Sequence, residues 1–112
     1  MVHIHSDIKR GLCLLLLSLN MLTPGVSQAN DTLSIFACEP EWAALAKQLG
    51  GDRVDVYSAT TAKQDPHHVQ ARPSLIAKAR RADLLVCSGA ELEVGWLPLL
   101  LRKAGNARIA SE

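Results

Sequence analysis

Short apolar segments alternate with amphipathic segments of helical period along most of this 112-residue chain. Four apolar segments, bounded by turn-forming residues, are predicted to be strands. The three segments between them each carry Pro near the start, and the first and third also carry Gly near the end, which is typical of helices. The predicted strands cover residues 32–38, 52–60, 83–89 and 107–111, and the predicted helices cover residues 39–51, 73–82 and 96–106.

This β-α-β-α-β-α-β order predicts an α/β fold in which a mostly parallel sheet is flanked by helices. The segment at residues 83–89 is the most apolar of the four, so we expect it to be a central strand. In the first helix, Trp42, Leu45, Ala46 and Leu49 share one face, and Trp42 is expected to be a packing residue. In parallel sheets of this kind, ligands bind at the carboxyl ends of the strands.

The first 29 residues have the three-part pattern of a secretory signal peptide. A basic pair at residues 9–10 precedes an apolar run at residues 12–22, and small residues lead to a predicted cleavage point after Ala29. The apolar run is about half of the roughly 20 residues that a membrane-spanning helix needs. We therefore predict an exported chain whose single α/β domain covers residues 30–112.

The composition argues against several classes of function. The formal net charge is +1 and no basic stripe is present, which gives no support to nucleic-acid binding. No Ser-His-Asp arrangement, phosphate-binding glycine loop or HExxH motif occurs, so the sequence does not predict an enzyme.

Two adjacent histidines, His67 and His68, follow Asp65-Pro66 in the loop after the second predicted strand. Neutral imidazole is a good ligand for zinc and related cations, and Asp65 could orient a ligating ring. Adjacent residues of an extended backbone point to opposite sides, so one metal ion is expected to use one ring. The alternative, from the pattern alone, is a solvated polar turn.

Cys38 and Cys87 are the cysteines that remain after removal of the predicted signal peptide, and each ends a predicted strand. Export permits a disulfide between them, and the alternative is that both are small buried hydrophobic residues. Three acidic residues lie near the same end of the sheet. Glu39 is expected to stabilise the start of a helix, and Glu91 and Glu93 are expected to be solvated or to contact a permease rather than to bind metal.

The string from Asp65 to Trp96 resembles the metal-binding substrate-binding proteins of bacterial ABC importers for zinc and manganese. The shared features are a D-P-H loop, a proline at a helix start, an "ADL" at the helix end and a strand leading to G-x-x-L-E. In this chain they are Asp65-Pro66-His67, Pro73-Ser74, Ala82-Asp83-Leu84 and Gly89-Ala90-Glu91-Leu92-Glu93, with Trp96 close behind.

The resemblance implies a fold of two α/β lobes joined by a long rigid helix, with the metal held between the lobes. This chain would be the amino-terminal lobe, incomplete and without the second lobe. His67 would be the first metal ligand, His68 a bystander or alternate ligand, and the remaining ligands would lie beyond residue 112. Cys38 and Cys87 would end neighbouring strands, if the sheet follows the family order.

The implied function is capture of a divalent metal in the periplasm and delivery to an ABC permease in the inner membrane by a monomeric protein. Zinc is the first expectation because imidazole suits it, with Mn²⁺ and Fe²⁺ as alternatives. A second hypothesis is a small periplasmic thiol-disulfide or copper-handling protein that uses Cys38 and Cys87; the missing CxxC spacing argues against it.

Overall fold

The computed structural model describes residues 31–110, so the predicted signal peptide lies outside the described residues. Three strands and three α-helices alternate along this part of the chain, with a short 3₁₀ turn at Gly51–Arg53. None of the described helices is both long enough and apolar enough to cross a bilayer. The elements are β1 Leu33–Ala37, α2 Pro40–Gly50, β2 Val54–Ser58, α3 Pro73–Arg81, β3 Leu84–Val86 and α4 Leu97–Ala104.

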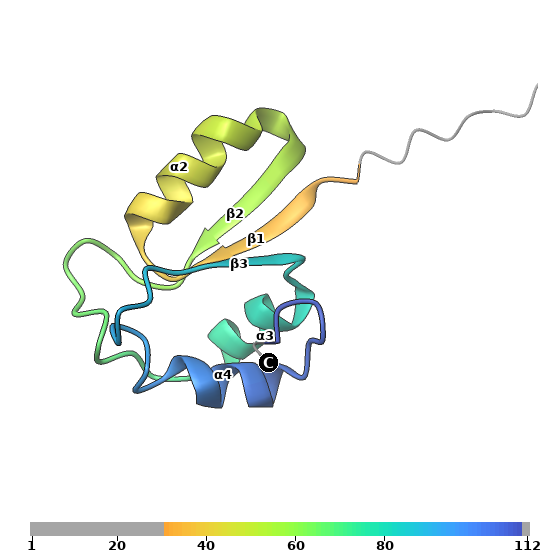
Figure 1. Ribbon diagram of the computed structural model, residues 1–112. Coiled ribbons are helices and arrows are strands. Elements are labelled where there is room, and N and C mark those ends of the chain that lie inside the picture. The colour runs from red at the N-terminus through yellow and green to blue at the C-terminus, as the bar shows by residue number, and fades with distance from the viewer. Residues whose placement is uncertain (1–30, 111–112) are drawn as a thin grey trace, which may run out of the picture.

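The three strands form a parallel sheet in the order β2-β1-β3. Figure 1 shows α2 on one side of this sheet and α3 and α4 on the other. The predicted α/β class with a parallel sheet and flanking helices is therefore confirmed. The prediction that the segment at residues 83–89 is central is wrong within the described sheet, where β1 is central and β3 lies at the edge. The apolar character of a strand reports its burial, which does not by itself reveal the order of the strands.

The helices begin and end where the sequence places its backbone signals. Pro40 and Pro73 are the first residues of α2 and α3, where the missing proline N–H removes no helical hydrogen bond. Gly105 adopts a left-handed conformation (φ 61°) and its N–H donates to Leu101 O, which ends α4.

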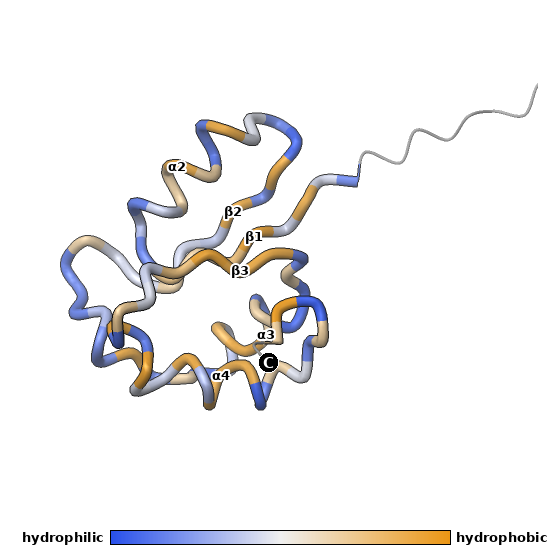
Figure 2. The backbone as a smooth tube through the Cα atoms, viewed as in Figure 1, coloured by the Kyte–Doolittle hydropathy of each residue, from blue (hydrophilic) through white to orange (hydrophobic). Residues whose placement is uncertain are grey.

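The main core lies between the sheet and the helices α3 and α4. Leu75 of α3 and Leu100 of α4 are both 0% exposed, and full burial of such a side chain contributes about 1.5–3 kcal/mol. In Figure 2 the hydrophobic colouring of β1 and β3 marks the strands that line this core. Its buried members are Phe36, Cys38, Ala59, Leu75, Ala79, Ala82, Trp96, Leu100, Ala104 and Ile109.

The opposite face of the sheet is only partly covered. Helix α2 packs mainly on β1 and β2, and it contains no buried residue. Leu45 is 44% and Leu49 is 80% exposed, so the helical face of Trp42, Leu45, Ala46 and Leu49 is turned toward the sheet but is not fully buried. These residues instead line an open apolar groove of about 380 Å³, together with residues of β1 and β3.

The prediction of a strand at residues 107–111 is also wrong for the described part of that range. Residues 107–109 form turns instead, and Ser111 lies outside the described residues. The side chain of Asn106 explains the difference. Its Nδ2 donates to Ala79 O (3.0 Å) and Ala82 O (2.7 Å), and its Oδ1 accepts from the N–H of Arg108 (3.1 Å). These bonds fold the chain back onto the end of α3, and Ile109 enters the core at 5% exposure.

Candidate metal centre

The loop after β2 contains a tight turn over residues 65–68. The N–H of His68 donates to Asp65 O (3.1 Å), and the N–H of His67 donates to the Asp65 carboxylate Oδ1 (2.9 Å). Asp in the first position and Pro in the second are the residues that such a turn favours, because Pro fixes φ and the Asp side chain accepts a local backbone bond. The sequence Asp65-Pro66 therefore specifies the local geometry that presents both histidines.

Both imidazole rings bind the same carboxylate. His67 Nδ1 lies 2.7 Å from Asp65 Oδ1, and His68 Nδ1 lies 3.0 Å from Asp65 Oδ2. The prediction that adjacent side chains point to opposite sides of an extended strand does not hold, because the backbone turns here. The pKa of Asp65 lies far below its usual range. The largest cause is the hydrogen bond from the backbone N–H of His67, and the contacts with the two rings lower the pKa further.

An ionised Asp65 has a direct consequence for the rings. A carboxylate can only accept hydrogen bonds, so each Nδ1 carries the hydrogen and each Nε2 of a neutral ring keeps its lone pair. The side chains of His67 and His68 are 55% and 83% exposed. In each ring, Nε2 is therefore available to bind a metal ion. The side chain of His67 is the less exposed of the two.

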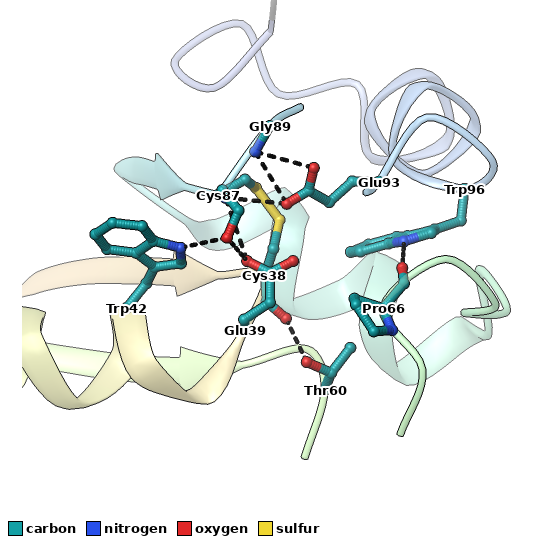
Figure 3. The surroundings of a disulfide bond; sticks show 10 residues. Cys38, Glu39, Trp42, Thr60, Pro66, Cys87, Gly89, Glu93 and Trp96 are labelled. Atoms are coloured by element: carbon teal, nitrogen blue, oxygen red, sulfur yellow. Dashed lines mark hydrogen bonds between the residues drawn. A yellow bond between two sulfur atoms is a disulfide. The ribbon is translucent and has the colours of Figure 1, made fainter. Parts of the chain in front are cut away.

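A buried tryptophan fixes the turn to the rest of the fold. Trp96 is 2% exposed, and its indole Nε1 donates to Pro66 O at 2.7 Å (Figure 3). A Cβ atom added at Gly95 would lie 3.3 Å from His67 O, so the backbone approaches the turn closely there. We expected Trp96 only as a packing residue. The signal for its second role is its position just after the G-x-x-L-E motif.

The two cysteines meet where β1 and β3 end. Ala37 pairs with Val86 in the parallel register, and the N–H of Cys38 donates to Val86 O at 2.9 Å. The register brings Cys38 and Cys87 together, with Cα atoms 4.8 Å apart, and the structure joins their sulfur atoms in a disulfide (Figure 3).

Two buried carboxyl groups lie beside this bridge. Glu93 is 3% exposed and accepts from the N–H groups of Ser88 (3.0 Å) and Gly89 (3.1 Å). Glu39 is 4% exposed, and its Oε2 accepts from the N–H and the hydroxyl of Ser88, both at 3.2 Å. The expectation that Glu93 is solvated is thus wrong, whereas Glu91 is exposed. Glu39 precedes α2 but makes no side-chain cap there.

The environment of Glu39 opposes ionisation. Burial, then a hydrogen bond to Glu93 and the charge of that group, raise the pKa of Glu39 to about 7, against the opposing hydrogen bonds from Ser88. A proton on one carboxyl group can be donated to the other, which explains why two acidic side chains are buried together.

The raised pKa of Glu39 predicts that the protein loses stability as the pH rises. Between about pH 4.5 and about pH 7 the folded state holds a proton that the unfolded state releases, so the free energy of unfolding falls across this window. The expected loss is at most about 3 kcal/mol. Denaturant unfolding of the disulfide-bonded protein at both ends of the window measures it.

Glu39→Gln should flatten this pH dependence and stabilise the protein at the upper end, because the amide resembles the protonated acid. Glu91→Gln is the matched control, since Glu91 is exposed and should leave the slope unchanged. A free energy of unfolding that rises with pH, or a slope that Glu39→Gln leaves intact, would contradict the assignment.

Comparison with known proteins identifies the family. Residues 35–112 match the ZnuA family model, described as "Zinc-uptake complex component A periplasmic". The chain is 32% identical over 104 residues to scaA of Streptococcus gordonii, a manganese ABC transporter substrate-binding lipoprotein, covering 85% of this chain and 34% of the relative. It is 29% identical over 82 residues to MtsA of Streptococcus pyogenes, an iron ABC transporter substrate-binding lipoprotein, covering 70% and 26%.

Among solved structures, Zn(II)-bound AdcA from Streptococcus pneumoniae matches with a TM-score of 0.57 and 25% identity, over 72% of this chain and 17% of that chain. The chain thus spans about a third or less of the length of these proteins. The resemblance noted in the string from Asp65 to Trp96 is confirmed. The chain belongs to the ZnuA family of metal ABC transporter substrate-binding proteins, which are binding proteins rather than enzymes.

Proposed function

We propose that this chain is the amino-terminal lobe of a periplasmic receptor that captures a divalent transition metal and delivers it to an ABC permease, with His67 Nε2 as one metal ligand. The observation that carries the proposal is the His67 ring, whose Nδ1 is bound by an ionised Asp65 in a turn anchored by Trp96.

A histidine that binds metal usually has a hydrogen-bond partner on its second ring nitrogen, and Asp65 is that partner for His67. A carboxylate on the second ring nitrogen fixes the tautomer and the orientation of the ring, and it raises the basicity of the ligating nitrogen. The Asp65 turn follows β2, and so belongs to the carboxyl edge of the parallel strands, where ligands bind in open α/β sheets. The indole bond to Pro66 O reduces the motion of the turn, which favours a defined coordination geometry.

We propose zinc as the cargo, with Mn²⁺ and Fe²⁺ as alternatives. Imidazole suits zinc, whereas manganese favours carboxylate, carbonyl and water ligands. The related proteins are themselves described for manganese, iron and zinc. The choice among these metals depends on the complete set of ligands, of which His67 is one.

We propose that both lobes supply metal ligands, because zinc requires more ligands than this turn offers. A tightly bound zinc ion takes about four ligands, and the turn offers His67 with His68 as the alternate. We propose that the other ligands belong to a second lobe encoded beyond residue 112, and that the monomeric receptor reaches the periplasm after cleavage following Ala29.

The alternative of a thiol-disulfide or copper-handling protein is less favoured. A reactive thiolate needs a neighbouring positive charge or a similar stabilising environment. Cys38 and Cys87 are instead joined in a disulfide, and the ionisable side chains brought beside them are the buried acids Glu39 and Glu93.

The test is calorimetric titration of zinc into wild-type, His67→Ala and His68→Ala proteins that carry both lobes. The proposal expects a large loss of affinity for His67→Ala alone. Equal affinity in all three, or a loss confined to His68→Ala, would contradict it.

A further inference from the structure

A second group of potential metal ligands lies apart from the His67 turn, at the ends of β1 and β3. The sulfur atoms of Cys38 and Cys87 and a carboxylate oxygen of Glu93 all lie within 4.8 Å of one another. Among residues 31–110, this is the one group of three or more such ligand atoms that the structure brings together. Figure 3 shows Glu93 extending from its own segment toward the bridge.

A second buried carboxyl group lies beside this group of ligand atoms. Glu39 follows Cys38 directly and is 4% exposed, yet its Oε1 has no hydrogen-bond partner. The other oxygen of the same carboxyl group accepts hydrogen bonds from Ser88. A buried carboxyl oxygen without a partner is costly, and either a proton or a nearby cation would reduce that cost.

We propose that reduction of the Cys38–Cys87 disulfide opens a second metal site, in which the two thiolates and the Glu93 carboxylate bind a thiophilic divalent cation such as Zn²⁺ or Cd²⁺. The site is separate from the proposed cargo site, because it uses neither His67 nor His68.

The chemistry of the opening step is a two-electron reduction. A dithiol reductant donates two electrons and two protons to the bridge; it is oxidised to its own disulfide while Cys38 and Cys87 become thiols. The cation then displaces the two thiol protons, which are released to solvent, and two metal–sulfur bonds form. Reoxidation of the two thiolates to the disulfide removes both sulfur ligands and releases the cation.

The composition of the site explains which ion it would take. Thiolate sulfur selects zinc and other soft or borderline cations over magnesium and calcium. Two thiolates and a carboxylate carry three negative charges in a mostly buried position, and a divalent cation offsets most of that charge. Because a thiol must lose its proton to bind the cation, metal binding and thiol deprotonation are coupled.

The experiment uses cadmium alone as the probe. The common background is the full chain in which Cys13, within the predicted signal peptide, is replaced by Ser, so that Cys38 and Cys87 are its two cysteines. A trialkylphosphine reduces the bridge without adding thiols; it is oxidised to the phosphine oxide, with water as the oxygen source. We expect the reduced chain to bind one Cd²⁺ with a near-ultraviolet thiolate-to-cadmium charge-transfer band. The oxidised chain should lack this band.

Four variants separate this site from its surroundings. Glu93→Gln should weaken cadmium binding by at least about tenfold, whereas Glu91→Gln, an exposed residue of the same segment, should not. His67→Ala should keep the band, so failure of the proposed cargo site leaves this result unchanged. Cys87→Ser should lose the band, and circular dichroism shows whether each variant is folded.

Two results would overturn the proposal. One is a reduced chain with two titratable thiols that shows no charge-transfer band on addition of cadmium. The other is a band that persists unchanged in the folded Cys87→Ser and Glu93→Gln variants.

Discussion

Reduction of the Cys38–Cys87 bridge is expected to lower the free energy of unfolding by about 4 kcal/mol. The bridge joins residues 49 positions apart, and a cross-link of that span removes much of the freedom of the unfolded chain. It also ties β1 to β3, the strand at the edge of the described sheet. Denaturant unfolding of oxidised and reduced protein, both with Cys13→Ser and a chelator present, measures the difference.

The chelator is needed because a metal bound to the reduced cysteines would restore part of the lost stability. A Cys38→Ser, Cys87→Ser double variant is the matched control, and its stability should resemble that of the reduced protein and not change with reductant. Two titratable thiols in the oxidised protein under denaturing conditions, or equal stability with and without reductant, would contradict the bridge.

Substitution of His67 by Ala is expected to lower the zinc affinity of the two-lobed protein by at least about 100-fold. Loss of a carboxylate that merely orients a ligating imidazole already costs about 10–100-fold, and loss of the ligand itself should cost more. Asp65→Asn should therefore give an intermediate loss, because the ring keeps its nitrogen but loses its ionised partner. Calorimetry or competition with a zinc chelator measures each affinity.

His68→Ala is the matched control for this prediction. His68 binds the same carboxylate through Nδ1 but is more exposed, at 83% against 55% for His67. Its removal should leave the affinity near that of the wild type. A loss for His68→Ala as large as that for His67→Ala would mean that both rings bind the ion.

The sequence predicted those parts of the fold that depend on local signals. The apolar segments before Cys38 and Cys87 and the prolines at Pro40 and Pro73 identified strands and helices close to their observed bounds. The order of the strands was not predictable in this way, because strand pairing depends on contacts far apart in the sequence. The strand expected near Ile109 failed for a similar reason, since the Asn106 side chain bonds to the distant end of α3.

The candidate site likewise contains residues that the local sequence predicted and residues that it did not. Asp65 and His67 were found because the Asp-Pro-His turn is local and its residue types carry their own chemistry. The indole bond from Trp96 to Pro66, over 30 positions, was not predictable from spacing, and neither was the burial of Glu39 beside Glu93. Acidic side chains are usually expected at the surface, and only the fold brings these two, from distant parts of the sequence, together in the interior.

The most direct test of the central claim is anomalous diffraction from a crystal of the two-lobed protein soaked with Zn²⁺. Our account predicts an anomalous peak about 2.0–2.1 Å from His67 Nε2, with Nδ1 of the same ring still bound to Asp65. A fully occupied zinc peak elsewhere, with His67 Nε2 facing bulk water, would contradict it.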